Sequence, residues 1–205
     1  MNSTLEYYNN NVSSLLGRYN SAKVTSLHKR LLNSFPTGAK LLDAGCGSGR
    51  DADFMIRMNY DVLAVDASGS MIQGAVKHFP LLQNCCRMII IPDELDQLEQ
   101  NSFGGIYSIA VLMHLNEDDI KNSLLEFKRL LIKNGCLFFS VCLTRSSEIK
   151  GDFDLVGRRF TLRPETWWHN LCLSSGFSVV ESDISSDGLR RDNVEWLNIL
   201  CRKDM

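Results

Sequence analysis

Three kinds of feature are missing from this sequence, and each absence excludes a class of protein. No apolar run approaches the ~20 residues of a membrane-spanning helix, so we expect no membrane association. Lys and Arg number 22 against 24 Asp and Glu, a formal net charge of −2, so no basic excess favours a nucleic-acid partner. Residues 1–11 have neither a basic start nor an apolar stretch, which predicts no secretory signal and a cytoplasmic location.

The seven cysteines lack the spacing of a metal site or a redox motif, because no C-x-x-C pair occurs. Cys46 lies in a glycine-rich turn, and Cys85 and Cys86 are adjacent. We therefore expect reduced thiols that pack as small apolar side chains, and no bound metal.

What is present fits one globular domain over residues 1–205. The hydrophobic fraction is 44% and the charged fraction 22%, and no repeat or linker divides the chain. We expect residues 1–36 to form an N-terminal cap of one or two helices and residues 37–205 to form the core.

Strand and helix patterns alternate from residue 40 onward. The strands are expected at 40–44, 61–66, 88–91, 105–112, 136–144, 177–182 and 194–202, and the helices at 51–59, 68–79 and 117–133, with one more opened by Pro164. Asn134-Gly135 is expected to end the long helix. The pattern predicts a doubly wound α/β fold, Rossmann-like, with a mainly parallel seven-stranded sheet and an antiparallel pair at one edge. Residues 145–159 are polar and are expected on the surface.

Residues 41–51, Leu-Leu-Asp-Ala-Gly-Cys-Gly-Ser-Gly-Arg-Asp, are the most informative stretch. They predict a strand, a sharp glycine turn and a helix, with free helix N–H groups facing a nucleotide-like ligand. Asp43 stands at the strand end, and Asp66 ends the next strand, where a carboxylate suits the two hydroxyls of a ribose. The alternatives for Asp66 are a helix cap or a solvated loop residue, and the glycine loop upstream favours ribose binding.

The spacing of this loop separates two cofactors. A dinucleotide fingerprint reads G-x-G-x-x-G, whereas this loop reads G-x-G-x-G with Asp43 two residues ahead. An NAD-binding oxidoreductase is therefore the alternative, and not the first interpretation.

The loop resembles motif I of class I methyltransferases, which use S-adenosylmethionine. The resemblance spans roughly residues 5–203 and continues at residues 65–68, Met71, 103–115 and 130–139. Within that class, Tyr7-Tyr8-Asn9, the Gly-Ser-Gly-Arg-Asp extension and residues 195–198 resemble small bacterial tellurite-resistance-type methyltransferases. The resemblance implies S-adenosylmethionine as the cofactor and a small-molecule acceptor.

The resemblance also implies roles for individual residues. The loop backbone would meet the methionyl end with Asp43 beside it, Asp66 would hold the ribose, residues 67–71 and 93–95 would surround the adenine, and Val111 would face the sulfonium. The cofactor-binding residues expected on this basis are Tyr8, Arg18, Asp43, Ala44, Gly45, Cys46, Gly47, Arg50, Asp51, Asp66, Ala67, Ser68, Met71, Glu94, Leu95 and Val111. The family usually has Asp where this chain has Gly104, which we expect to alter loop packing.

Methyl transfer needs alignment more than a strong base. His114, after the fourth strand, and Tyr8, in the N-terminal segment, are the candidate catalytic residues. A helix-start hydrogen bond or a packing role explains His114 equally well. Tyr8 and Arg18 could each simply anchor the first helix, which is the slightly better explanation for Arg18. One of Trp167 and Trp168 is expected in the core and the other in the acceptor cleft. The arginine pairs 158–159 and 190–191 lie on loops near the end of the sheet and could attract an acidic acceptor, but solvated surface charge is the favoured interpretation of both.

Two further alternatives remain. A nucleic-acid methyltransferase would carry Asn/Asp-Pro-Pro-Tyr or Pro-Cys after its fourth strand, and this chain has Ala-Val-Leu-Met-His there. A non-catalytic module that binds S-adenosylmethionine stays open, because no strong base is evident.

Overall fold

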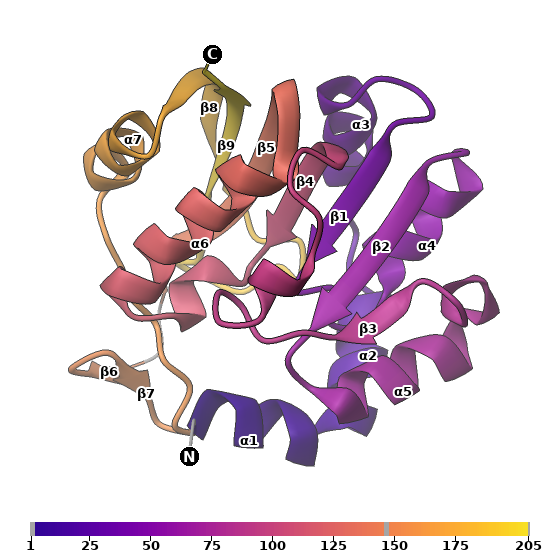
Figure 1. Ribbon diagram of the computed structural model, residues 1–205. Helices are drawn as coiled ribbons and strands as arrows, with labels where there is room; N and C mark the ends of the chain where they lie inside the picture. The colour runs from indigo at the N-terminus through magenta and orange to yellow at the C-terminus, as the bar shows by residue number, and fades with distance from the viewer. Residues whose placement is uncertain (1–2, 146–147, 205) are drawn as a thin grey trace.

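The computed structural model describes residues 3–145 and 148–204, and a seven-stranded sheet runs through their centre (Figure 1). The strand order is β3-β2-β1-β4-β5-β9-β8. All neighbours pair in parallel except β9, which is antiparallel to both β5 and β8. The strands are β1 (Lys40–Ala44), β2 (Asp61–Asp66), β3 (Cys86–Met88), β4 (Phe103–Ile109), β5 (Leu131–Thr144), β8 (Phe177–Ser186) and β9 (Glu195–Lys203). The predicted doubly wound fold with an antiparallel edge is confirmed.

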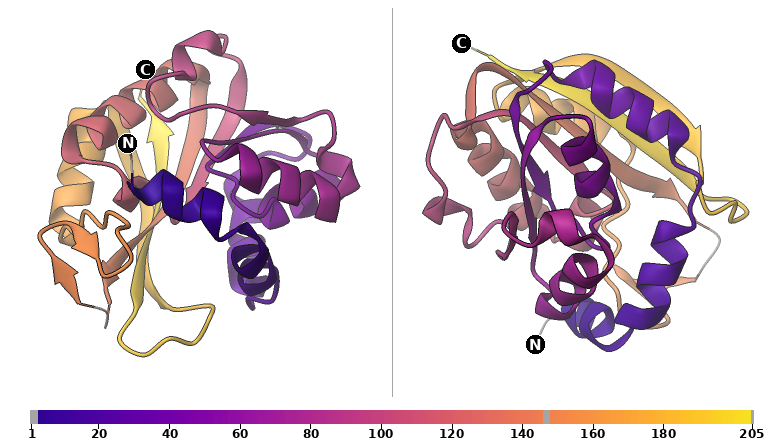
Figure 2. Two further views of the ribbon diagram at one scale, coloured as in Figure 1. Left: turned by 90° about the horizontal axis from the view of Figure 1, so that it is seen from below. Right: turned by 90° about the vertical axis from the view of Figure 1, so that its right-hand side faces the viewer.

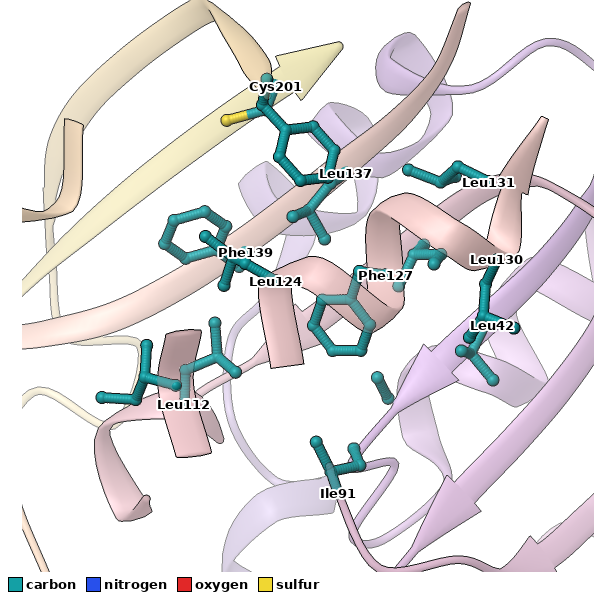
Figure 3. Close-up of a cluster of buried hydrophobic side chains, with 14 of the residues drawn as sticks. Leu42, Ile91, Leu112, Leu124, Phe127, Leu130, Leu131, Leu137, Phe139 and Cys201 are labelled. Atoms are coloured by element: carbon teal, nitrogen blue, oxygen red, sulfur yellow. The ribbon is translucent and has the colours of Figure 1, made fainter. Parts of the chain in front are cut away.

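Helices cover both faces of the sheet, because successive strand residues point to opposite sides. In β1, Leu42 packs toward α6 (Glu117–Leu130) and α7 (Glu165–Ser174), within the core cluster of Figure 3. Its neighbour Leu41 packs in a second cluster with side chains of α3 (Thr25–Ser34), α4 (Arg50–Arg57) and α5 (Gly69–His78). Both leucines are fully buried, which explains the apolar character of the strand.

The N-terminal segment forms three helices instead of the expected one or two. α1 (Ser3–Asn10) and α2 (Val12–Asn20) lie below the carboxyl ends of the parallel strands and contact α5 (Figure 1). α3 instead places Leu31 in the core beside the sheet. Within the N-terminal segment, α1, α2 and the connection to α3 therefore cover that end of the sheet, whereas most of α3 packs beside the sheet.

Several element boundaries differ from the sequence expectation, since β4 covers 103–109 instead of 105–112, β5 begins at 131 instead of 136, and β8 extends to 186 instead of 182. The third strand is β3, and the apolar residues that follow it, Ile89 and Ile91, are buried in the core as a connection. Helix α6 ends at Leu130, since Leu131 turns to extended backbone and pairs with Phe103. The left-handed residue after it is Asn134, with φ 62°, and not the glycine beside it.

Residues 149–154 form a short hairpin of β6 (Ile149–Lys150) and β7 (Phe153–Asp154). Residues 146 and 147, within the expected surface stretch 145–159, lie outside the described residues. Within the described part of the chain, no helix is long and apolar enough to cross a membrane.

Candidate active site

A cavity of about 520 Å³ lies where β1, β2 and β4 end. Its volume is in the range of small-molecule and cofactor sites. The glycine loop after β1, the ends of β2, β4 and β5, helix α1, the α2–α3 connection and the β8–β9 loop all contribute to the lining. Seen from that end of the sheet, α1 crosses in front of the strands (Figure 2, left).

The glycine loop is held mainly by its own N–H groups. Its three glycines have positive φ: 91° at Gly45, 52° at Gly47 and 76° at Gly49. The N–H groups of Gly45 and Cys46 both donate to the Val65 carbonyl at 2.8 Å, and that of Gly47 donates to an Asp66 oxygen at 2.8 Å. These three loop donors are therefore engaged within the protein. The loop can offer carbonyl oxygens instead, which suit a cationic group.

Asp66, at the end of β2, joins the glycine loop after β1 to the turn before α5. One carboxylate oxygen accepts the Gly47 N–H and the other accepts the Ser68 N–H, each at 2.8 Å. Burial raises the pKa of Asp66, and these two hydrogen bonds partly oppose that shift. Ser68 caps α5 by accepting the Met71 N–H at 3.0 Å. Each Asp66 oxygen keeps a further lone pair for a ligand in the cavity.

Asp43 is a buried carboxylate in the cavity wall with one unsatisfied oxygen. Its side chain is buried, and its Oδ2 has no hydrogen-bond partner among the described residues. Burial, and after it the negative charge of Asp51, raise the pKa of Asp43 well above its usual range. The Tyr107 hydroxyl beside Asp43 opposes this rise of the pKa only in part. A buried carboxylate oxygen without a partner is costly, so Oδ2 favours a cation or a hydrogen-bond donor supplied by a ligand.

A hydrogen-bonded cluster joins the N-terminal segment to α4. Arg50 holds Asp51 through Nε and Nη2 at 2.9 and 2.8 Å and donates from Nη1 to the Tyr19 carbonyl at 2.7 Å. His28 approaches Asp51 at 2.8 Å and stacks on Phe54 with ring centroids 3.8 Å apart. The hydrogen bonds from His28 and Arg50 lower the pKa of Asp51 against the opposing effect of burial. Arg50 and Asp51 therefore anchor the cap beside the glycine loop.

Tyr8 and His114, the two candidate catalytic residues, are hydrogen-bonded across the cavity. Nδ1 of His114 lies 2.6 Å from the Arg159 carbonyl, which can only accept, so Nδ1 carries the proton. Nε2 then accepts the Tyr8 hydroxyl at 3.1 Å. Burial lowers the pKa of His114 to about 4, and the charges of Arg158 and Arg145 add to that shift. At neutral pH the pair is uncharged.

The interpretation of Arg158 as solvated charge is wrong. Its side chain is 13% exposed and binds Asp154 through Nε at 3.0 Å and Nη2 at 2.7 Å. Arg145, also thought to lie on the surface, is 10% exposed and lies 3.5 Å from the same carboxylate. Both arginines line the cavity beside Phe160. The sequence signal was weak, because nothing local shows that Asp154 folds inward.

The tryptophan prediction is half right. Trp168 is fully buried, but Trp167 packs against the same core cluster and does not reach the cavity. The tryptophan that lines the cavity is Trp196, whose Nε1 donates to Asp187 at 2.9 Å. Asp187 also pairs with Arg191, which is 43% exposed. The β8–β9 loop therefore belongs to the site, which the sequence did not indicate.

Most of the expected site residues come together around this cavity. Those that line it are Tyr8, Asp43, Gly45, Cys46, Gly47, Arg50, Asp51, Asp66, Ala67, Ser68, Val111 and His114. Five others do not line it: Arg18, Ala44, Met71, Glu94 and Leu95.

Each of those five has a physical reason to lie elsewhere. Arg18 is exposed on α2, whereas Ala44, Met71 and Leu95 are fully buried in the core. Glu94 is half-buried and uses a carboxylate oxygen to accept the Ile90 N–H at 2.8 Å.

Comparison with known proteins agrees with this arrangement. A family model described as a methyltransferase domain matches residues 42–139, from β1 into β5. The chain is 32% identical over 149 residues to the uncharacterized methyltransferase YodH of Bacillus subtilis (strain 168). The matched region is 69% of this chain and 61% of that relative, so the chain spans less than two thirds of its length. These matches make the chain similar to class I S-adenosylmethionine-dependent methyltransferases over residues 42–139.

Two solved structures share this fold. A TehB-like methyltransferase from Corynebacterium glutamicum superposes with a TM-score of 0.68 at 22% identity, covering 98% of each chain. The 1,6-didemethyltoxoflavin-N1-methyltransferase of Burkholderia thailandensis gives a TM-score of 0.66 at 22% identity, over 88% of this chain and 76% of that one. That structure contains S-adenosylhomocysteine and 1,6-didemethyltoxoflavin. The tellurite-resistance subgroup itself stays a prediction.

The residues of this methyltransferase domain fit S-adenosylmethionine, the cofactor of the family. The orphan Asp43 oxygen suits an ammonium group, and Asp66 keeps lone pairs for a ribose. A Cβ at Gly47 would meet only Met71 Cε, 4.0 Å away, so the loop leaves open space there. Gly104 lies at the start of β4, the end of the strand remote from the cavity, where a Cβ would meet Ala39 at 3.1 Å. Its difference from the family pattern therefore concerns packing.

Proposed function

We propose that the protein transfers a methyl group from S-adenosylmethionine to a small-molecule acceptor. The observation that carries this proposal is the unpaired Asp43 oxygen in the same cavity as Asp66 and the Tyr8–His114 pair. When bound, the cofactor supplies a methyl carbon activated by a positive sulfur, which an acceptor attacks in line. The protein's task is then to align the two molecules and keep water out.

Each end of the cavity has its own role in this proposal. Asp43 and the carbonyl groups of the glycine loop bind the amino-acid end of the cofactor, and Asp66 binds its ribose. Val111 packs over the loop, since a Cβ at Gly45 would lie 2.3 Å from its Cγ2. It therefore limits how far the cofactor can shift from the position that alignment needs.

Tyr8 is the residue that we expect to contact the acceptor. Its hydroxyl donates to His114 and keeps its oxygen available to accept a proton-bearing group of the acceptor. His114 acts as a positioning residue, because a pKa of about 4 makes it a weak base while its fixed tautomer orients Tyr8. The proton of the acceptor leaves through Tyr8 or directly to solvent.

Calorimetry and a turnover assay test this proposal. We expect S-adenosylmethionine and S-adenosylhomocysteine to bind, with Asp66→Asn weakening both at least about tenfold through loss of a charge-assisted hydrogen bond. A panel of small-molecule acceptors should yield S-adenosylhomocysteine in repeated turnovers. NADH binding in place of either compound would favour the oxidoreductase alternative, and cofactor binding without turnover by any acceptor would favour a binding module.

A further inference from the structure

Two buried polar side chains on neighbouring strands face the cavity. Ser140 on β5 and Asn198 on β9 stand directly opposite each other in the antiparallel ladder, and both line the cavity. They are 4% and 6% exposed. Among the described residues, no hydrogen bond involves the Ser140 hydroxyl or the Asn198 Oδ1. A buried polar atom without a partner is costly, so this pair favours a ligand that supplies hydrogen bonds.

The amide of Asn198 is held in one orientation. Its Nδ2 donates to the Ser185 hydroxyl at 3.0 Å, and an Asp183 carboxylate oxygen lies 3.4 Å away. The main-chain carbonyls of Asp183 and Trp196 are also within 3.5 Å of Nδ2. A flipped amide would bring Oδ1 against these oxygens, which can only accept. Nδ2 therefore stays with them, and Oδ1 is the atom left for a ligand.

An aromatic surface follows the polar pair on the same face of the sheet. Cys142 and Trp196 are cross-strand partners two residues along from Ser140 and Asn198, so their side chains lie on the same side, and both line the cavity. The Trp196 Nε1 donates to Asp187 at 2.9 Å, which fixes the indole ring. A ligand that reaches the polar pair therefore has a fixed aromatic surface beside it.

The polar pair suits an N–H group and a carbonyl on one edge of a ligand. Oδ1 of Asn198 only accepts, whereas the Ser140 hydroxyl can donate to a carbonyl. Opposed side chains in an antiparallel ladder have Cβ atoms about 4.5–5.5 Å apart, so the two ligand groups must point the same way from neighbouring atoms. An open-chain secondary amide is trans and points them in opposite directions, whereas a ring holds them on one side.

We propose that the methyl acceptor is a small planar lactam, with its N–H on Asn198 Oδ1, its carbonyl on the Ser140 hydroxyl and its ring against Trp196. This inference rests on the proposed methyl transfer, whose acceptor it names. The lactam edge is recognised, and a different nucleophilic atom of the acceptor attacks the methyl carbon. The new bond to carbon forms as the carbon–sulfur bond breaks, the electron pair of that bond stays on the sulfur, and the acceptor's proton leaves to solvent.

The same pair disfavours acceptors that present only oxygen lone pairs. A carboxylate or a lactone has no hydrogen for Asn198 Oδ1, which would stay unpaired in the complex. A site built to bind an N–H group rejects an analogue that lacks it for this reason. Selection by cavity shape alone predicts the opposite, because a lactam and its lactone have the same ring shape.

2-Pyridone and 2-pyranone, which differ by N–H against O, test the inference on the wild-type protein saturated with S-adenosylhomocysteine. Calorimetry should give 2-pyridone a roughly millimolar Kd, as expected for a compound of that size. 2-Pyranone and N-methyl-2-pyridone should bind at least about tenfold more weakly, because neither has the N–H group. Equal binding of the three compounds, or no binding of 2-pyridone, would overturn the assignment.

Asn198→Ala should remove the preference for 2-pyridone, bringing its Kd and that of 2-pyranone within about twofold of each other. The ratio of the two constants is the readout, because a general loss of structure would weaken both compounds alike. S-adenosylhomocysteine affinity should be unchanged. A variant that folds and keeps the tenfold preference would refute the role of Asn198.

Ser140→Ala is the second variant, and it carries the test if Asn198→Ala does not fold. It removes a hydroxyl that has no hydrogen-bond partner among the described residues, so we expect the fold to be kept. It should weaken 2-pyridone about two- to tenfold through loss of the bond to the carbonyl. Ser182→Ala is the matched control, since the Ser182 hydroxyl on β8 donates to Glu165 of α7 and does not line the cavity. Unchanged 2-pyridone affinity in Ser140→Ala, or an equal loss in Ser182→Ala, would count against the inference.

The failure of this inference can be told from the failure of the proposed function. Loss of S-adenosylhomocysteine binding in Asn198→Ala, with the ratio of the two ring compounds unchanged, would assign the pair to the cofactor and refute the inference alone. Repeated turnover only with acceptors that lack a lactam edge would also refute it and leave the methyl transfer standing. A wild-type protein that binds neither S-adenosylmethionine nor S-adenosylhomocysteine would refute the proposed function, and the acceptor with it.

Discussion

Replacement of Gly45 by alanine tests how Val111 closes the glycine loop. A Cβ at Gly45 would lie 2.3 and 2.8 Å from the two methyl carbons of Val111, well inside van der Waals contact. The φ of 91° adds backbone strain of about 1–2 kcal/mol for a residue with a side chain. Overpacking against Val111 adds about 1–3 kcal/mol. We therefore expect Gly45→Ala to lower the free energy of unfolding by about 2–5 kcal/mol.

Gly38 is the matched control for the backbone contribution. Its φ is 75°, and a Cβ there would meet nothing within 4 Å. Gly38→Ala should therefore lower stability by about 1–2 kcal/mol only. Chemical denaturation measures both variants, and calorimetry with S-adenosylhomocysteine measures whether Gly45→Ala also weakens the cofactor.

Val111→Ala separates the clash from the strain. In the Gly45→Ala background, this second change removes both methyl groups that meet the new Cβ, so we expect about 1–3 kcal/mol of the lost stability to return. The strain at φ 91° should remain. If Gly45→Ala is no worse than Gly38→Ala, or if Val111→Ala restores nothing, Val111 does not pack on the loop as described.

The contributions of His114 and Asp51 to stability can be tested independently of the glycine loop. His114 has a pKa of about 4 in the folded protein against about 6.5 when unfolded, so it adds stability above pH 6.5 that is lost as the pH falls toward 4. Relative to His114→Phe, the wild type should lose up to about 3 kcal/mol over that range in denaturation at several pH values. Asp51→Asn should cost about 1–3 kcal/mol and increase hydrogen exchange in α2 and α3, because it breaks the anchor to His28 and Arg50; exposed Asp118→Asn should cost under about 0.5 kcal/mol.

The sheet was predictable because its strands follow simple local rules. β1 and β2 match the expected ranges, since each is a short apolar run bounded by turn residues and buried on both faces. The end of α6 was not predictable in the same way. Asn134-Gly135 carries a valid helix-stop signal, but pairing of Leu131 with Phe103 ends the helix earlier, and that contact joins segments far apart in the chain.

One end of the candidate site was predictable from local sequence, and the other end was not. The cofactor end lies on one continuous stretch and the end of the next strand, so the spacing of Asp43, the glycines and Asp66 predicted it. The hydrogen bonds of the loop N–H groups were not predictable, because sequence spacing does not show that the Val65 carbonyl and the Asp66 carboxylate accept them. Spacing identifies the loop but not the partner of each backbone group.

The acceptor end is assembled from segments that no short motif connects. The Arg159 N–H donates to the Thr4 hydroxyl across 155 positions, and Ser3 donates to the Gly157 carbonyl across 154. These contacts join α1, which carries Tyr8, to the segment that carries Arg158. Because the two are held together, a change in either segment alters both the charge that faces the acceptor and the orientation of Tyr8. Proteins with the same glycine loop can therefore differ in acceptor through these segments alone, while the cofactor end stays the same.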